Sequence, residues 1–314
     1  MKSKLRGELM LLLAALIWGA SFVAQRTGME YVGPFTFNGI RSLLGSLALV
    51  PVILVMNRQQ KRSSSVDPTQ NEAEKRNLLI GGGLCGLVLF VASSLQQYGM
   101  VYTTAGKAGF ITALYIVLVP LCGLFLGKKI RPLLWLCVAL ATVGLYLLSV
   151  QEGLAINKGD LLVLASAFGF TVHILVIDHF SPKTDGVKMS CLQFLVCGLL
   201  SLPFMLIFET IDWANIAACW LPIAYAGILS CGVAYTLQII AQKRTEPTIA
   251  SLLLSLESAF ALLAGMLILQ EQISLREAIG CLIMFAAIML AQLPEKRGLP
   301  TAAEEITPNH SAKI

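Results

Sequence analysis

Long uninterrupted apolar segments dominate this sequence and restrict the folds open to it. Hydrophobic residues make up 56% of the 314 residues and charged residues only 13%, well below the charged share of roughly 25% that is usual in soluble proteins. A helix needs about 20 apolar residues to cross a bilayer, and ten such segments fit in this length. The strict alternation of a membrane β-barrel is missing. The sequence therefore predicts an all-α membrane protein with ten transmembrane helices and excludes a soluble enzyme.

The expected helices fall into two groups of five. The first group lies near residues 8–25, 34–56, 78–98, 105–126 and 132–149, and the second near 160–177, 189–208, 220–241, 247–269 and 275–293. These groups define two expected domains, 8–150 and 158–293, after a short N-terminus at 1–7. The segment 57–77 and the tail 294–314 are too polar to bury a core. We expect a mobile loop and a disordered tail there, both cytoplasmic.

Basic residues are distributed unevenly between the two sides of the expected bundle. If both termini are placed inside, 18 of the 23 Lys and Arg residues lie on that side and four on the other. Cytoplasmic loops of membrane proteins collect Lys and Arg. The start of the chain resembles a signal peptide, but its apolar run is long enough to remain as a helix. We therefore expect a multi-pass protein of the bacterial inner membrane with both termini in the cytoplasm.

A short repeat links the two groups of helices. The segment VASSLQ at 91–96 recurs as VAYTLQ at 233–238, 142 residues later, and the same offset pairs Thr103 with Thr245 and Gly123 with Gly265. A duplicated unit with five crossings must enter the membrane in opposite orientation in its two copies. The sequence thus predicts two inverted five-helix repeats with a site between them, the arrangement used for alternating access. Transport is the leading functional class.

Glu257 is the charged residue placed deepest in an expected helix. A carboxylate at the centre of a bilayer costs about 2.5 to 3.5 kcal/mol, so its side chain must face protein or water. It could bind a cationic or zwitterionic substrate or couple transport to protons. The alternative is a structural pair with an arginine or with backbone amides.

Other polar and aromatic residues are expected around the same cavity. Tyr235 and Gln238 share one face of the eighth helix, and Gln96 lies at the matching place in the third. Trp18, on the first helix, could stack on a substrate or fill space in the core. These four residues and Glu257 are the main candidates for substrate binding.

Three further basic or titratable residues allow two interpretations each. Arg41 could take part in coupling, or could anchor the second helix by reaching the outer interface or helix carbonyls. Lys107 opens the fourth helix among glycines and could reach the substrate or a gate. His173 could relay protons, or be a hydrogen-bonded core histidine.

No catalytic, metal or cofactor motif occurs in the sequence. The three histidines form no metal-binding pattern, and no nucleophile motif or phosphate-binding loop is present. The eight cysteines lie mostly inside apolar runs without a C-x-x-C pair, so we interpret them as small core residues. The G-x-x-x-G pairs Gly82–Gly86 and Gly123–Gly127 predict close helix packing. We expect no enzyme, no cofactor, no metal and no nucleic-acid partner.

Several segments together resemble a known family. LLAALIWGASFV at 12–23, FNGIR at 37–41, LFLGKKI at 124–130 and LILQEQI at 267–273 are similar to the two EamA domains of the drug/metabolite transporter superfamily, over about residues 8–293. The resemblance implies a ten-helix carrier, often an exporter of amino acids or other small metabolites. It also implies a cavity lined by helices one, three, four, six, eight and nine. The family often has Glu-Pro in the ninth helix, whereas this chain has Glu257-Ser258, which leaves the bend of that helix open.

The expected function is therefore a secondary transporter of small organic metabolites, working outward by alternating access. The alternative is a passive channel or a structural or sensory membrane subunit. The sequence favours export but leaves open the substrate, the transport direction, the coupling ion and the oligomeric state.

Overall fold

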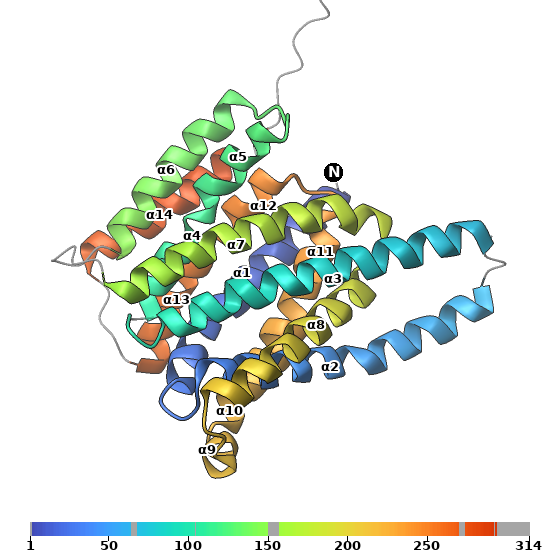
Figure 1. The fold of residues 1–314 in the computed structure, drawn as a ribbon. Coiled ribbons are helices and arrows are strands. Elements are labelled where there is room, and N and C mark those ends of the chain that lie inside the picture. The colour runs from blue at the N-terminus through green and yellow to red at the C-terminus, as the bar shows by residue number, and fades with distance from the viewer. Residues whose placement is uncertain are drawn as a thin grey trace, which may run out of the picture.

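The computed structural model describes residues 2–63, 68–103, 105–149, 157–269, 274–291 and 293. Within these residues all regular structure is helical (Figure 1). Eight helical segments are long and apolar enough to cross a membrane, and two shorter apolar helices, Pro132–Leu147 and Ala278–Ala291, complete the bundle. The expected all-α membrane fold is confirmed.

The first half contains five spans. They are formed by α1 (Lys2–Gly28), α2 (Pro34–Ser63), α3 (Pro68–Gly99), the pair α4 (Ala105–Ala113) and α5 (Tyr115–Phe125), and α6 (Pro132–Ser149). Proline opens α2, α3 and α6, where its missing N–H has no intrahelical partner to lose.

The second half repeats this order. It contains α7 (Lys158–Phe180) with the short η1 (Ser181–Lys183), α8 (Gly186–Phe208), α9 (Trp213–Ala218), and one span built of α10 (Trp220–Ala224), the π-helical η2 (Tyr225–Ala234) and α11 (Tyr235–Gln242). The last two spans are α12 (Pro247–Leu254) with α13 (Glu257–Leu269), and α14 (Leu275–Ala291). Side chains cap three of these helices: Asn157 and Asp160 form a capping box on α7, Asp185 caps α8, and Asp212 caps α9.

The prediction of a loop at 57–77 is wrong, because most of this segment is helical. α2 continues to Ser63 and α3 already begins at Pro68, so that only residues 64–67 of this segment lie outside the described residues. At about 1.5 Å per residue, helices of 30 and 32 residues exceed a hydrocarbon core of about 30 Å. Their polar ends extend the helices beyond the apolar spans, and in Figure 1 α2 and α3 project past the rest of the bundle. The expected disordered tail 294–314 lies outside the described residues.

Contacts between helices follow an approximate twofold relation. α2 packs against α8, and α6 against α14, each pairing a helix with its counterpart in the other half. The contact of α3 with α7 corresponds to that of α1 with η2 and α11, and the contact of α1 with α13 corresponds to that of α7 with α4 and α5. The two halves are thus consistent with inverted repeats, and α6 and α14 form a pair of their own beside the bundle (Figure 1).

The fourth and ninth spans are both interrupted near the middle. The first break falls at Leu114, between α4 and α5, and the second at Ser255 and Leu256, between α12 and α13. These positions are related by the repeat offset, because Leu114 corresponds to Leu256. The ninth span is therefore discontinuous even though no proline follows Glu257.

One of the two G-x-x-x-G pairs has a different role from the predicted one. Gly82 and Gly86 pack against Leu192 and Val196 of α8, as expected. Gly127, in contrast, has a φ of +75° and follows the end of α5, where the N–H of Lys128 binds the carbonyl of Gly123 at 2.9 Å. This pair therefore ends a helix by a glycine in the left-handed conformation.

Candidate functional site

A cavity lies between the two halves of the molecule, and its empty space, including the part open to solvent, is about 640 Å³. Eight of the spans contribute to its wall, including the second and seventh, which the family resemblance does not place there. The lining residues are Trp18, Phe22, Gln25, Asn38, Arg41, Ser42, Leu89, Ser93, Gln96, Thr112, Tyr115, Phe170, His173, Ile174, Phe194, Cys197, Ser230, Cys231, Tyr235, Gln238, Leu254 and Glu257. Apolar and aromatic side chains share this wall with an equal number of polar and charged ones.

Helical spacing brings these side chains to one place. Trp18, Phe22 and Gln25 follow one another at intervals of four and three along α1, and residues at this spacing share a helix face. Asn38, Arg41 and Ser42 of α2 lie at positions i, i+3 and i+4 and also share a face. The face that α1 presents to the cavity is thus largely aromatic, and the face of α2 is polar.

Arg41 is buried in this wall with 6% of its surface exposed. Its Nη1 donates to Gln25 Oε1 at 2.7 Å, while Nε and Nη2 both donate to Asn38 Oδ1, at 3.2 and 3.0 Å. The expected reach to the interface or to helix carbonyls is therefore wrong, because side-chain amides hold the guanidinium inside the bundle. Its described polar partners are neutral.

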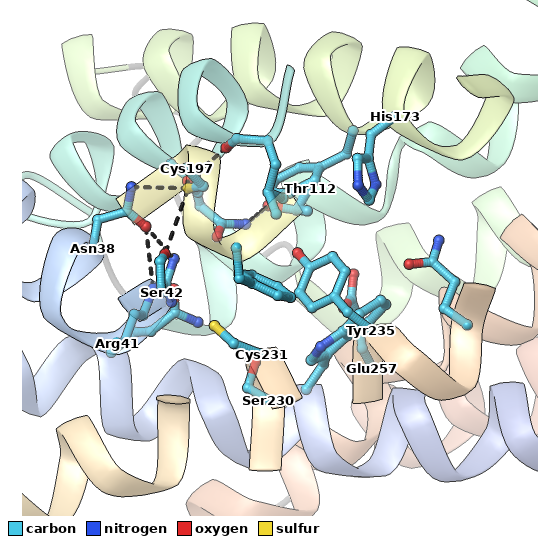
Figure 2. Close-up of a pocket in the computed structure, with 18 of the residues that line it drawn as sticks. Asn38, Arg41, Ser42, Thr112, His173, Cys197, Ser230, Cys231, Tyr235 and Glu257 are labelled. Atoms are coloured by element: carbon cyan, nitrogen blue, oxygen red, sulfur yellow. Dashed lines mark hydrogen bonds between the residues drawn. The ribbon is translucent and has the colours of Figure 1, made fainter. Parts of the chain in front are cut away.

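Glu257 contacts its counterpart in the first repeat. Tyr115 Oη donates to Glu257 Oε1 at 2.9 Å, and both side chains are buried. Glu257 is the first residue of α13, next to the break in the ninth span. A carboxylate at this position faces the positive end of the helix dipole. Figure 2 shows Arg41 and Glu257 on opposite sides of the cavity, with Cys231 and Tyr235 between them.

Aromatic rings cluster around Tyr235 at the start of α11. Its ring centroid lies 4.5 Å from that of Trp18, 5.1 Å from that of Phe194 and 5.7 Å from that of His173. His173 also shares a hydrogen bond of 3.0 Å with Gln193. This is the hydrogen-bonded histidine of the second interpretation, and its ring also forms part of the cavity wall.

Gln96 and Gln238 occupy equivalent places but have different surroundings. Gln96 Nε2 donates to Thr112 Oγ1 at 2.9 Å, while the repeat counterpart of Thr112 is Leu254. Gln238 Oε1 and the indole nitrogen of Trp18 are buried and have no hydrogen-bond partner in the described part of the chain. Buried polar atoms are rarely left unpaired in native proteins, so a bound molecule is one way to satisfy them.

The cavity brings together seven of the eight residues predicted from the sequence. Glu257, Gln238, Tyr235, Gln96, Trp18, Arg41 and His173 all line it. Lys107 lies in the first turns of α4, but its side chain is outside the described residues.

Several polar lining residues were missed by the sequence reasoning. Asn38, Ser42, Ser93 and Thr112 are small polar residues within apolar runs, where many others serve only as helix packing. The available signal was sequence spacing: Asn38 lies three residues before Arg41, so that the two side chains share a helix face.

Comparison with known proteins agrees with this architecture. The EamA-like transporter family matches residues 5–150 and 157–293, which covers nearly the whole chain in two copies. The chain belongs to the EamA-like transporter family. Its membership confirms the resemblance drawn from the motifs and makes the protein a membrane transporter and not an enzyme.

Relatives of the same length support the assignment. An uncharacterized transporter of Archaeoglobus fulgidus is 28% identical over 92% of this chain and 87% of its own length. The uncharacterized transporter YoaV of Bacillus subtilis is 25% identical over 88% of this chain and 92% of its own. A solved crystal structure shares the fold with a TM-score of 0.73 at 20% identity, covering 91% of this chain and 98% of that one.

Proposed function

We propose that this EamA-family protein is a secondary transporter that carries small organic zwitterions, amino acids or related compounds, outward by alternating access. The observation that carries the proposal is the cavity between the two halves, whose wall holds one buried guanidinium, Arg41, and one buried carboxyl group, Glu257.

Arg41 provides a place for an anionic group of the substrate. A guanidinium has five N–H donors, and three of them bind Gln25 and Asn38. One hydrogen on each terminal nitrogen is left over, which matches the two oxygens of a carboxylate. Among the described residues no carboxylate forms an ion pair with Arg41, so a substrate anion would neutralise a buried charge.

Glu257 provides a place for a cationic group. The bond from Tyr115 occupies one side of its carboxyl group, at Oε1, and leaves the other oxygen for an ammonium group. Because Arg41 and Glu257 lie on opposite sides of the cavity (Figure 2), a molecule with both charges can contact both residues.

The remaining wall suits an apolar body between the charges. Trp18, Phe22, Phe170, Phe194 and Tyr235 line the cavity, and aromatic side chains of this kind are usual in small-molecule sites. The indole N–H of Trp18 and the amide oxygen of Gln238 could hydrogen-bond to such a substrate.

Flux into and out of proteoliposomes tests the proposal. Wild-type protein is screened with radiolabelled amino acids for saturable uptake and for exchange against unlabelled substrate. Glu257→Gln and Arg41→Gln should each reduce this flux at least about tenfold, the effect of losing about 1.4 kcal/mol of binding. The matched control is Thr142→Val on α6, where the Thr142 hydroxyl binds only the carbonyl of Val138 in its own helix.

The same assay separates the transporter from a channel. Flux that rises linearly with concentration, without exchange, would contradict alternating access and favour a passive pore. Flux that is saturable but unaffected by both variants would leave a carrier with its binding site elsewhere. Comparing vesicles of the two orientations under an imposed proton gradient tests the outward direction.

A further inference from the structure

The internal repeat extends to the first helix of each half. Gly7-Glu8-Leu9 at the start of α1 corresponds to Gly159-Asp160-Leu161 at the start of α7. The two helices also make equivalent contacts, since α7 packs on α3 while α1 packs on η2 and α11. Because Thr103 corresponds to Thr245, the pair Thr103 and Asp160 has a counterpart in Thr245 and Glu8.

The first of these pairs is joined by a hydrogen bond. Thr103 Oγ1 donates to Asp160 Oδ1 at 2.8 Å, and the two residues are only 7% and 4% exposed. The bond connects the end of α3 with the start of α7, which lie side by side in Figure 1. A buried bond to a carboxylate is among the stronger contacts that can join two helices.

Further contacts close the same end of the bundle. A Cβ atom on Gly159 would lie 2.6 Å from the carbonyl oxygen of Gly99, so the two backbones touch. Asn157 Nδ2 donates to the carbonyl of Tyr102 at 3.1 Å, and Lys158 Nζ lies 3.9 Å from the centre of the Tyr102 ring. The helices α3 and α7 are therefore drawn together where they leave the apolar span.

The counterpart at the other end is looser. A Cβ atom on Gly7 would lie 3.0 Å from Thr245 Oγ1 but 3.5 Å from the carbonyl oxygen of Ala241, the residue equivalent to Gly99. Thr245 is buried, and its hydroxyl makes no hydrogen bond to the described part of the chain. The hydrogen bond between Thr103 and Asp160 thus holds α3 and α7 together at one end of the bundle. The equivalent bond from the Thr245 hydroxyl, at the opposite end, is not made.

We propose that these two pairs are the gates of the transporter. Thr103 and Asp160 hold one face closed in the state seen here, and Thr245 with Glu8 closes the opposite face in the alternate state. The inversion of the repeats places equivalent residues on opposite faces, so making one bond and breaking the other exchanges access to the cavity. This inference depends on the alternating access proposed above.

Two native cysteines allow a direct test. Cys197 and Cys231 line the cavity, so a variant that keeps only these two of the eight cysteines reports access to it. Oriented vesicles of both kinds are treated with a small membrane-impermeant maleimide. Without gate mutations, labelling should come from the face opposite Thr103.

Thr103→Val removes the hydroxyl donor and leaves the capping box of α7 intact. We expect it to raise the rate of labelling from the Thr103 face about tenfold, the population change that corresponds to one lost hydrogen bond to a charged group. Thr103→Ser should restore the original rate. The control is Thr171→Val, also on α7, whose hydroxyl binds only Ala167 in its own helix.

A second variant acts on the same gate without touching the hydrogen bond. Gly159→Ala places a methyl group against Gly99 and should also open the Thr103 face. Unchanged labelling from that face in both Thr103→Val and Gly159→Ala would overturn the gate assignment.

Two further measurements separate the test of the proposed function from that of the gate assignment. Linear flux without exchange in the proteoliposome assay would contradict alternating access itself, whatever the labelling pattern. Thr245→Val should lower labelling from the Thr103 face, not raise it, and should reduce net flux several-fold, because the alternate state, in which that face is open, loses its bond. If that variant transports normally, the second gate is wrong.

Discussion

Tyr115 and Glu257 occupy the same position in the two repeats and are hydrogen-bonded to each other. The 2.9 Å bond joins residues 142 apart, which is the offset of the repeat. Each is the first residue after the break in its span, since α5 begins at Tyr115 and α13 at Glu257. The inverted repeats therefore meet at this bond, and a duplicated position carries two different side chains that complement each other.

Replacing Tyr115 by Phe tests the energetic role of this bond. The change leaves the ring in place but removes the hydroxyl from a buried carboxyl group, so the free energy of unfolding should fall by about 1 to 3 kcal/mol. Thermal denaturation in detergent measures the loss. Tyr146→Phe is the control, because Tyr146 is 45% exposed on α6. Equal midpoints for the two variants would show that the bond adds nothing.

Arg41→Lys tests whether the shape of the guanidinium matters as well as its charge. Lysine is a compact point charge and cannot reproduce the fork that binds Gln25 and Asn38 together. In a thermal-shift screen against amino acids and their amides, we expect bound amino acids to stabilise the wild type more than their amides do. Arg41→Lys should lower this affinity about tenfold, and Arg41→Gln should abolish the preference. A preference that survives in Arg41→Gln would place the substrate carboxylate elsewhere.

Gly144 tests the contact between α6 and α14. A Cβ atom there would lie 2.7 Å from the carbonyl oxygen of Gly280 and 2.9 Å from the backbone nitrogen of Met284, and neither backbone atom can move aside as a side chain could. Gly144→Ala should destabilise the protein by about 1 to 3 kcal/mol, as overpacking usually does. Gly83→Ala is the matched control, since nothing lies within 4 Å of its added methyl group. The measurement is thermal denaturation of both variants; a stable Gly144→Ala variant would contradict this packing.

Ser258→Pro tests the origin of the break in the ninth span. Ser258 is in the first turn of α13, so proline there removes the bond from its N–H to the carbonyl of Ser255 (3.2 Å) and the bond from its hydroxyl to the carbonyl of Gly109 (3.1 Å) but leaves the rest of the helix intact. This variant should therefore fold with a moderate loss of stability. Leu262→Pro, one turn further along α13, should cost about 3 kcal/mol or more. Yield and thermal midpoint in detergent compare the two. Equal damage from both substitutions would mean that α13 does not begin at Glu257.

Single cysteines at Arg58 and Arg276 test the orientation of the chain. Both residues are exposed, and the distribution of basic residues predicts Arg58 in the cytoplasm and Arg276 outside. In a cysteine-free background, an impermeant maleimide added to intact cells should label only the variant at 276. Labelling of both positions from one face would refute the inverted repeats.

Most of the fold follows from the sequence because membrane insertion depends on local composition. Apolar length alone places the spans, and the repeat at 91–96 and 233–238 predicts their inversion. The segment 57–77 shows the limit of this reasoning. Its polar residues cannot be buried, but they form good helices outside the membrane, and α2 and α3 therefore continue into it.

The side chains of the cavity were predicted where a polar group would be costly in lipid, as for Glu257 and Arg41. The sequence could not supply their partners. Tyr115 reads as an ordinary aromatic residue of an apolar helix, and Asn38 as a small polar residue among many. Only the packing of the two halves shows that each contacts a charged group.

Hydropathy and repetition along the chain were sufficient to predict the membrane environment, the number of spans and the duplication, because each of these is a property of local sequence. The tertiary structure alone decided which duplicated positions meet, which of two equivalent hydrogen bonds is made, and where the fourth and ninth spans are interrupted. Those outcomes depend on distances of a few ångströms between helices that are far apart in the sequence, and no local pattern encodes them.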